Sequence, residues 1–211
     1  MPVSSLSSRS TRKPKGEGHA RRGEILAAAE RIFVEHGYEG ATIRKIADEV
    51  GLSSTALYMH FSDKGEILLE ICRDAFAALI ARTSDLSELD APPEDRLRRM
   101  IDAYVEFGFA QPNAYRLIYL TRPIEARDGA QTAAQELGAD LFTAFEAVVG
   151  ETVAAGRMKG DPRTLAQAIW AAGHGVVSLM ITKPYFPWTD RQVLTKTLLD
   201  ALFDGLLVRR T

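Results

Sequence analysis

The chain has 211 residues, 46% of them hydrophobic and 26% charged, and this ordinary globular composition excludes a disordered or fibrous protein. No apolar run approaches the roughly 18 residues of a membrane span, and the single cysteine, Cys72, excludes an intramolecular disulfide, so the sequence predicts a cytoplasmic protein without a membrane partner. The net charge of -2 gives no general indication of nucleic-acid binding.

Residues 1–20 are predicted to form a disordered basic arm. Residues 1–22 contain six Lys or Arg side chains and one acidic side chain, whereas residues 65–211 contain 16 basic and 20 acidic side chains. A basic end on a mildly acidic chain indicates that one part of the molecule contacts phosphate groups. The segment loosely resembles a transit peptide, but it lacks an apolar region and an amphipathic repeat.

The next segment is predicted to contain two short helices joined by a tight turn. Apolar residues at helical spacing predict a first helix over residues 21–36, which Gly37 ends. Thr42 is the expected N-cap of a helix that runs to Val50, and Ser53 is the expected N-cap of a helix that runs to Phe61. The turn between them gives the outline of a helix-turn-helix. Asp63 is expected to cap a longer fourth helix.

The remaining chain also shows helical periodicity and no strand alternation. Loops are expected at 83–90 and 183–187, where polar residues and prolines gather. Helices are expected over 94–110, between Pro112 and Pro123, over 128–156, over 162–182 with Asp161 as N-cap, and after Thr189 as the last N-cap. The predicted fold class is therefore all-α, with about nine helices.

Residues 25–64 carry a set of motifs whose boundaries coincide with those of the predicted helices. They are ILAAAERIF at 25–33, GY at 37–38, ATIRKIA at 41–47, GLS at 51–53, LYMHF at 57–61 and Lys64. Together they resemble the DNA-binding segment of the TetR family of transcriptional regulators. The resemblance implies a basic arm at 1–20, a helix-turn-helix DNA-binding domain at 21–66 and a ligand-binding and dimerisation domain at 67–211.

The first turn of the second short helix is expected to meet the major groove of double-stranded operator DNA. Short hydroxyl side chains on that turn can contact base edges or phosphates. The full set of candidate DNA contacts is Thr42, Arg44, Ser53, Ser54, Thr55, Tyr58, His60 and Lys64. Tyr58 and Phe61 have a second interpretation as core residues, and His60 is not expected to bind a metal. The sequence departs from the family pattern at 54–56 and 59–60, which leaves the base preference open.

Trp170, His174 and Gly175 resemble a Trp-x-x-x-His-Gly element of one branch of TetR-like C-terminal domains. Trp170 and His174 are four residues apart and share a helix face. They either line a ligand cavity or belong to the core, and metal binding is a third, weaker interpretation. The candidate ligand-binding residues are Tyr104, Phe107, Tyr119, Trp170 and His174.

Family resemblance places a homodimer interface on the last two long helices, where small residues and a long apolar stripe permit close packing. The predicted function is a transcriptional regulator, a repressor rather than an activator in the usual sense of the family, released from DNA by a small-molecule effector of unknown identity. No cofactor or metal is expected. An enzyme is disfavoured because no nucleophile–base pair or phosphate-binding loop is found. An architectural DNA-binding protein would not need so large an aromatic helical domain.

Overall fold

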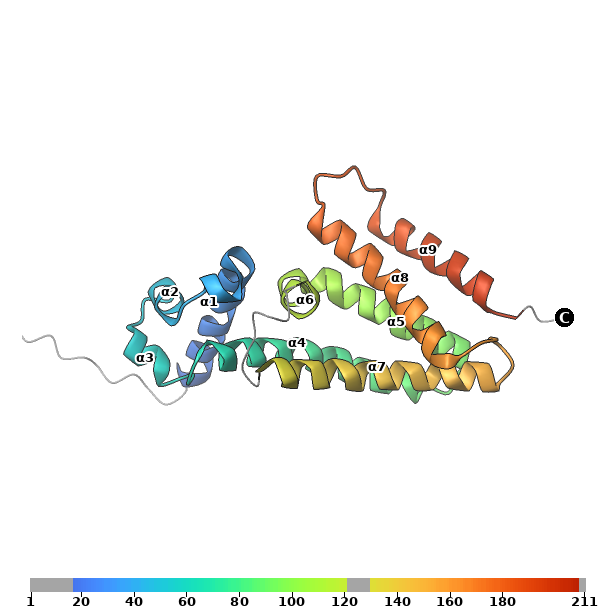
Figure 1. The fold of residues 1–211 in the computed structure, drawn as a ribbon, viewed down its shortest axis with the longest axis horizontal. Coiled ribbons are helices and arrows are strands. Elements are labelled where there is room, and N and C mark those ends of the chain that lie inside the picture. Colours follow the sequence, from blue (N-terminus) through green and yellow to red (C-terminus); the bar gives the residue numbers. More distant parts are fainter. Residues whose placement is uncertain (1–16, 121–129, 209–211) are drawn as a thin grey trace, which may run out of the picture.

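A computed structural model describes residues 17–120 and 130–208, with side chains described for residues 19–120 and 138–208. Within these ranges the chain is all-α, as predicted, and β structure is limited to one isolated bridge between Met158 and Leu207. The helices in the described residues are α1 Glu17–Gly40, α2 Ile43–Glu49, α3 Ser54–Tyr58, α4 Lys64–Ser87, α5 Pro93–Ala110, α6 Pro112–Tyr119, α7 Ala130–Ala154, α8 Pro162–Thr182 and α9 Arg191–Leu206. The molecule is elongated, with α1–α3 at one end (Figure 1). The predicted arm at 1–20 falls mostly outside the described residues.

The two short helices at this end are held by the predicted caps. The Thr42 hydroxyl accepts a hydrogen bond from the Lys45 N–H at 3.2 Å, and the Ser53 hydroxyl accepts one from the Ala56 N–H at 3.1 Å. Gly51 joins the helices with φ 65°, a left-handed conformation that a residue with a Cβ adopts at a cost. The caps and the glycine therefore fix the helix-turn-helix geometry locally, within 15 residues of chain.

Helix α4 connects the two ends of the molecule because it belongs to both hydrophobic cores. Ile67 and Ile71 pack in the core of α1–α3, whereas Ala75 and Leu79 pack in the core of α5–α9. The predicted boundary between residues 66 and 67 thus lies within one continuous helix. The predicted loop at 83–90 is wrong over 83–87, because Thr83 is buried and the helix continues to Ser87.

The larger core is formed where α5 crosses α8 closely at two glycines. A Cβ at Gly108 would lie 2.4 Å from Val177 Cγ1, and one at Gly173 would lie 2.8 Å from Ile101 Cδ1. A larger residue at either position would therefore require the neighbouring side chains or the helices to move. Among the described residues, α8 is the one helix whose length and composition would suit a membrane span, but one face of it is buried in this core.

Other helix ends also differ from the prediction, and α1 begins at Glu17 and not at residue 21. Helix α3 ends at Tyr58 and not at Phe61, since Phe61 leaves the helix to fill the core between α1 and α4. The N-cap of α9 is Asp190 and not Thr189, because the Asp190 carboxylate accepts hydrogen bonds from the N–H groups of Gln192 and Val193 at 2.9 and 3.1 Å. A carboxylate at this position also interacts favourably with the helix dipole.

Candidate DNA-binding surface and effector cavity

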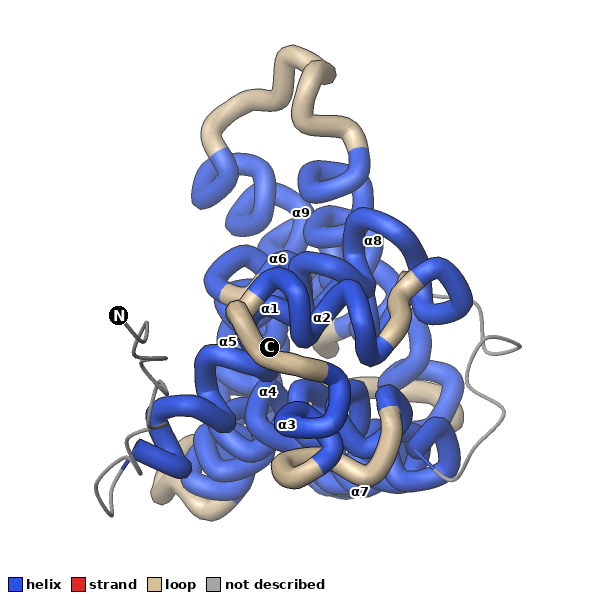
Figure 2. Tube along the Cα trace, turned by 90° about the vertical axis from the view of Figure 1, so that its left-hand side faces the viewer, coloured by secondary structure: helices blue, strands red, loops and turns tan. Residues whose placement is uncertain are grey.

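The exposed side of α3 lies at the end of the molecule that carries α1–α3 (Figure 2). Leu57 is fully buried and anchors α3 on the neighbouring helices, while Thr55 is exposed and Tyr58 and Met59 are 54% and 84% exposed. The exposure of Tyr58 argues against its interpretation as a core residue. The exposed Met59 was not among the predicted contacts, although its position beside Tyr58 in the LYMHF motif could have indicated it. Ser53 is also exposed.

Other predicted contacts lie around this surface in different environments. Arg44 projects from α2 with an 85% exposed side chain and lies 3.8 Å from the Asp48 carboxylate. Ser54 and His60 are half-buried. Thr42 uses its hydroxyl as a helix cap, as described above. The structure therefore brings the predicted residues of α2 and α3 to one end of the molecule but leaves them unequally accessible.

Lys64 is held by the protein itself. Its ammonium group donates a hydrogen bond to the Tyr38 carbonyl at 2.8 Å and lies 4.2 Å from the centre of the Tyr38 ring. It also lies 3.4 Å from the Ala41 carbonyl and 3.9 Å from the Glu39 carboxylate. These contacts tie the start of α4 to the segment that precedes Thr42. Lys64 thus helps to position the N-terminus of α2, in addition to its predicted contact with DNA.

Arg22 plays a comparable part on the other side of the helix-turn-helix. Its guanidinium lies 4.0 Å from the centre of the Phe61 ring, and its Nε donates to a Glu70 carboxylate oxygen at 2.7 Å. It also donates to the carbonyl of His60. Arg22 therefore joins α1, the chain after α3 and α4 through one side chain, and its charge is committed to this network.

The second part of the molecule contains an apolar cavity of about 140 Å³ between α4, α5, α7 and α8. Of the predicted ligand-binding residues, Tyr104, Tyr119 and Trp170 line it, whereas Phe107 and His174 do not. Phe107 is buried and stacks on Phe76 with ring centres 6.5 Å apart. Sequence reasoning missed the other lining residues, which are Leu79, Thr83, Met100, Ile101, Gly138, Leu141, Phe142 and Phe145.

A cluster of three polar side chains lies beside the cavity. The Tyr104 and Tyr115 hydroxyl oxygens are 2.9 Å apart, and His174 Nδ1 lies 2.6 Å from the Tyr115 oxygen and 3.2 Å from the Tyr104 oxygen. Burial raises the pKa of both tyrosines and lowers the pKa of His174, so all three groups are neutral near pH 7. Because two phenol O–H groups face Nδ1, we assign Nδ1 as the acceptor and place the imidazole proton on Nε2.

The lowered pKa of His174 predicts a loss of stability in mild acid. The unfolded chain binds a proton at His174 near the ordinary histidine pKa of 6.5, and the folded chain binds it only at lower pH. The free energy of unfolding should therefore be highest above pH 6.5 and fall as the pH decreases below that value. Thermal unfolding of the wild type and His174→Gln between pH 5 and 8 tests this. Parallel pH profiles for the two proteins would contradict it.

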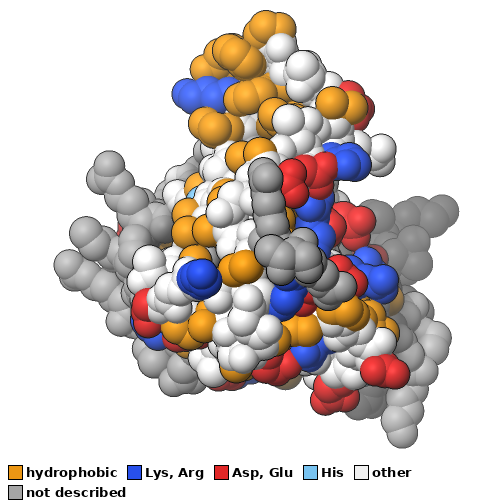
Figure 3. Space-filling view, turned by 90° about the vertical axis from the view of Figure 1, so that its right-hand side faces the viewer, with side chains coloured by type: hydrophobic (Ala, Val, Ile, Leu, Met, Phe, Trp, Pro, Cys, Tyr) orange, Lys and Arg blue, Asp and Glu red, His pale blue; other side chains and the backbone are white. Residues whose placement is uncertain are grey.

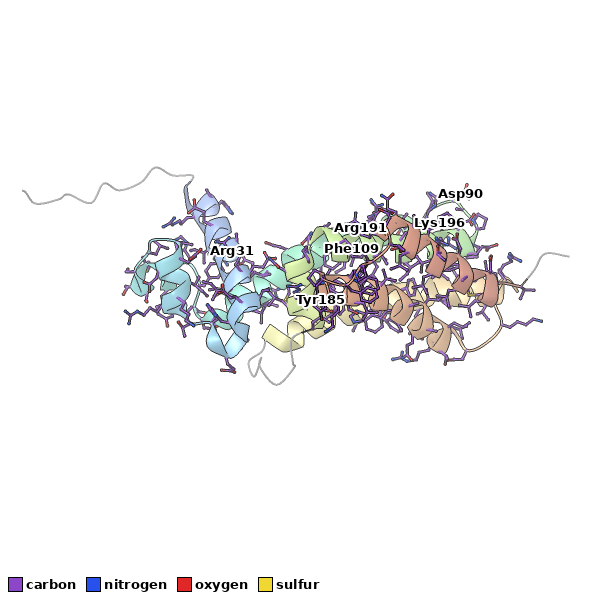
Figure 4. The ribbon with its side chains drawn as sticks, turned by 90° about the horizontal axis from the view of Figure 1, so that it is seen from above. Arg31, Asp90, Phe109, Tyr185, Arg191 and Lys196 are labelled. Atoms are coloured by element: carbon purple, nitrogen blue, oxygen red, sulfur yellow. The ribbon has the colours of Figure 1, made fainter. Side chains whose placement is uncertain are left out.

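A second depression, the polar groove between α5 and α9, has a different chemistry and a volume of about 690 Å³. Arg98 hydrogen-bonds to the carboxylates of Asp102 and Asp200 at 3.2 and 2.7 Å, so its charge is neutralised within the protein. The guanidinium of Arg191 lies 4.8 Å from the centre of the Phe109 ring. The view from above labels these two residues next to each other (Figure 4). Compensated charges and wide opening to solvent make this groove a poor enclosure for a small ligand.

Two family models match the chain. The model for bacterial regulatory proteins of the tetR family matches residues 25–71, and the model for a tetracyclin repressor-like C-terminal domain matches residues 97–204. The first match covers α2 and α3 together with parts of α1 and α4, and the second covers the helices that surround the apolar cavity from α5 onward. The two matches therefore correspond to the two ends of the molecule.

Curated relatives match over part of their length. The transcriptional activator FasR of Mycolicibacterium smegmatis is 34% identical over 119 residues, which cover 54% of this chain and 53% of FasR. The transcriptional repressor KstR2 of Mycobacterium tuberculosis is 38% identical over 91 residues, which cover 43% of this chain and 46% of KstR2. The chain thus spans about half the length of these relatives in the matched regions.

Solved structures match over nearly the whole described fold. The structure of the ketosteroid transcriptional regulator KstR2 of Mycobacterium tuberculosis has a TM-score of 0.73 at 25% identity, covering 90% of this chain and 96% of that chain. The regulator PfmR of Thermus thermophilus has a TM-score of 0.73 at 24% identity, covering 90% of this chain and 98% of that chain. The arrangement of the helices is therefore shared over both ends of the molecule.

Proposed function

This chain belongs to the TetR family of bacterial regulatory proteins, and from that premise we propose that it is a DNA-binding transcriptional regulator. We further propose that it is cytoplasmic, that it acts as a homodimer, and that a small-molecule effector releases it from its operator. The main support for the proposal is that α4 belongs both to the helix-turn-helix end of the molecule and to the wall of the apolar cavity. One end of α4 supports the capped helix-turn-helix, and Leu79 and Thr83 of the same helix line the apolar cavity. We propose repression, as the KstR2 and AcnR relatives are named repressors, while FasR is named an activator.

In the proposed complex, α3 enters the major groove of double-stranded operator DNA. The hydroxyls of Ser53, Ser54 and Thr55 contact bases or phosphates, and Tyr58 and His60 contact the backbone near the end of α3. Met59 adds an exposed apolar group of the kind that packs against a thymine methyl. Thr42 and Arg44 contact phosphates from α2, and Lys64 supports that helix from behind.

The Arg44→Ala substitution is expected to weaken specific and non-specific DNA binding alike. Removing one phosphate contact should reduce the slope of log affinity against log salt by about 0.9. Arg82→Ala is the matched control, because Arg82 is also exposed and also lies near a carboxylate, at 3.4 Å from Glu106, but belongs to the C-terminal part of α4, away from α2 and α3. Titrations at several salt concentrations measure both slopes. Equal slopes for Arg44→Ala and the wild type would remove Arg44 from the proposed contacts.

The proposed dimer interface lies on α8 and α9. Ala168, Ala171, Gly175 and Leu179 form a stripe along α8 that is exposed or half-buried, and Leu179 is 50% exposed. A Cβ at Gly175 would have no atom within 4 Å, so a second helix can approach there closely. Hydrophobic side chains also gather at the end formed by the α8–α9 loop (Figure 3). Apolar surface of this kind is typical of a covered interface.

Two helices are placed to couple the effector cavity to the DNA-binding end. Helix α4 lines the cavity and begins at Lys64, and α6 carries Tyr119 of the cavity wall and contacts α1. The Glu30 carboxylate of α1 accepts a hydrogen bond from the backbone of Ala114 near the start of α6. An effector that binds better to one arrangement of α4 and α6 would increase the population of that arrangement. The distance between the two α3 helices of the proposed dimer would change with it.

The decisive experiment is selection of bound sequences from random double-stranded DNA with the purified full chain. The proposal predicts an inverted repeat whose half-sites are about one helical turn, roughly 34 Å, apart, bound with a stoichiometry that sedimentation shows to be dimeric. Failure to enrich any sequence, or specific binding by a monomer, would overturn it. The basic arm at 1–20 is also predicted to contribute to DNA binding, but almost all of its residues lie outside the part of the chain that the structure describes.

A further inference from the structure

The apolar cavity has a size and a lining that restrict what it can hold. Its volume of about 140 Å³ is close to that of an engineered protein cavity of roughly 150 Å³ that binds benzene. Five aromatic side chains contribute to the lining, namely Tyr104, Tyr119, Phe142, Phe145 and Trp170. Aromatic rings favour edge-to-face and offset contacts with another ring. The cavity therefore suits a single aromatic ring with a small substituent.

The hydroxyl group of Tyr104 is already engaged with other groups of the protein. Its hydrogen is directed to the Tyr115 oxygen or to His174 Nδ1, which lie 2.9 and 3.2 Å away. Tyr119 packs against the same side chain, with the two ring centres 5.8 Å apart. A bound molecule therefore finds few free hydrogen-bond donors on this wall of the cavity.

The described part of the cavity wall also lacks a positive charge. None of its described lining residues is Lys, Arg or His, and His174 next to the wall is held neutral by burial. An anion in this site would lose its hydration without gaining a cation or several N–H donors. Burying such an unpaired charge is unfavourable, whereas an uncharged ring loses no ionic hydration.

We infer that the effector bound in the apolar cavity is a small, uncharged aromatic compound, and that an anionic compound of the same size is rejected. The inference rests on the proposed function, because it takes the apolar cavity as the effector site. It deepens that function by naming the chemical class of the effector from the size, aromatic lining and charge of the cavity.

Three probes with the same ring test the inference. Toluene has no polar group, p-cresol carries a hydroxyl, and p-toluate carries a carboxylate that is ionised at pH 7.5. Isothermal titration calorimetry of the full chain should show binding of toluene and p-cresol. Binding of p-toluate should be weaker by about tenfold or more, which corresponds to about 1.4 kcal/mol.

A variant that fills the cavity shows where the probes bind. A Cβ at Gly138 would meet only Phe76 Cζ, at the ordinary contact distance of 3.9 Å, and Gly138 lines the cavity, so Gly138→Leu adds apolar atoms to the cavity wall. Gly150→Leu is the matched control on the same helix, because a Cβ there has no atom within 4 Å. Both substitutions improve helix propensity. Only Gly138→Leu should abolish binding of toluene and p-cresol.

The outcomes separate the inference from the proposed function. Equal or tighter binding of p-toluate, no binding of any probe, or full binding of toluene by Gly138→Leu would each overturn the inference. Operator binding by the same protein preparations is measured in parallel without probes. Intact operator binding alongside any of these results refutes the effector class alone, whereas loss of sequence-specific DNA binding by the wild type refutes the proposed function.

Discussion

Replacing Ala171 by glutamate is expected to produce a monomer and to reduce specific operator affinity by about 10²- to 10⁴-fold. Ala171 lies in the middle of the exposed stripe on α8, where the proposed two-fold interface would bury it. A glutamate there would be desolvated without a cation opposite it, which costs several kcal/mol in each protomer. Because a monomer engages only one half-site, the avidity of the two recognition helices is lost.

The effect should arise without unfolding the protomer. Ala171 is exposed within the single chain, so the longer side chain has room, and glutamate is a good helix former. Ala78→Glu makes the same change at an exposed position of α4, away from α8 and α9, and should leave dimerisation and operator affinity unchanged. Analytical ultracentrifugation and operator titration are the measurements. An Ala171→Glu protein that remains dimeric at micromolar concentration would place the interface elsewhere.

The helix-turn-helix was predictable because its determinants are local in sequence. The caps at Thr42, Ser53, Asp63 and Asp161 each satisfy an N–H group three residues further along the chain, so a pattern of four residues specifies each of them. The wrong prediction of the N-cap of α9 is also a local one. Thr189 and Asp190 are adjacent potential caps, and the carboxylate of Asp190 accepts two N–H groups.

The roles of several charged residues could not be predicted because their partners are distant in sequence. Lys64 contacts the carbonyl of Tyr38, 26 residues earlier, and Arg22 contacts Glu70, 48 residues later. Sequence proximity to a DNA-binding motif suggests a phosphate contact for such side chains. Tertiary packing also uses them to hold α1, α2 and α4 together, and that role is visible only in the folded chain.

The lining of the apolar cavity was predicted in part, because some of its residues are aromatic. Tyr104, Tyr119 and Trp170 were recognisable as large side chains with polar tips on helical faces. Residues such as Leu79 and Gly138 have the same periodicity as ordinary core positions. Which of these residues face the cavity depends on how α4 and α7 pack against α5. That packing is determined by several helices together and cannot be predicted from the sequence of one helix.

The His174→Ala substitution is expected to destabilise the fold more than it alters effector binding. The imidazole is absent from the cavity lining, and its Nδ1 accepts hydrogen bonds in the cluster with Tyr104 and Tyr115. Removing it leaves a void and deprives buried phenol O–H groups of an acceptor. The combined cost is about 2–4 kcal/mol, and at roughly 2–4 °C per kcal/mol for a chain of this size the melting temperature should fall by about 5–15 °C.

A double-mutant cycle identifies the hydrogen bond as the cause. Tyr115→Phe removes the hydroxyl that lies 2.6 Å from Nδ1, so the double variant should be less destabilised than the sum of the two single variants. His36→Ala, at an exposed position of α1, is the matched histidine control and should leave the melting temperature unchanged. Titration of the folded His174→Ala dimer with p-cresol should give nearly the wild-type affinity. An unchanged melting temperature together with weakened p-cresol binding would contradict this assignment and favour a direct contact between His174 and the bound molecule.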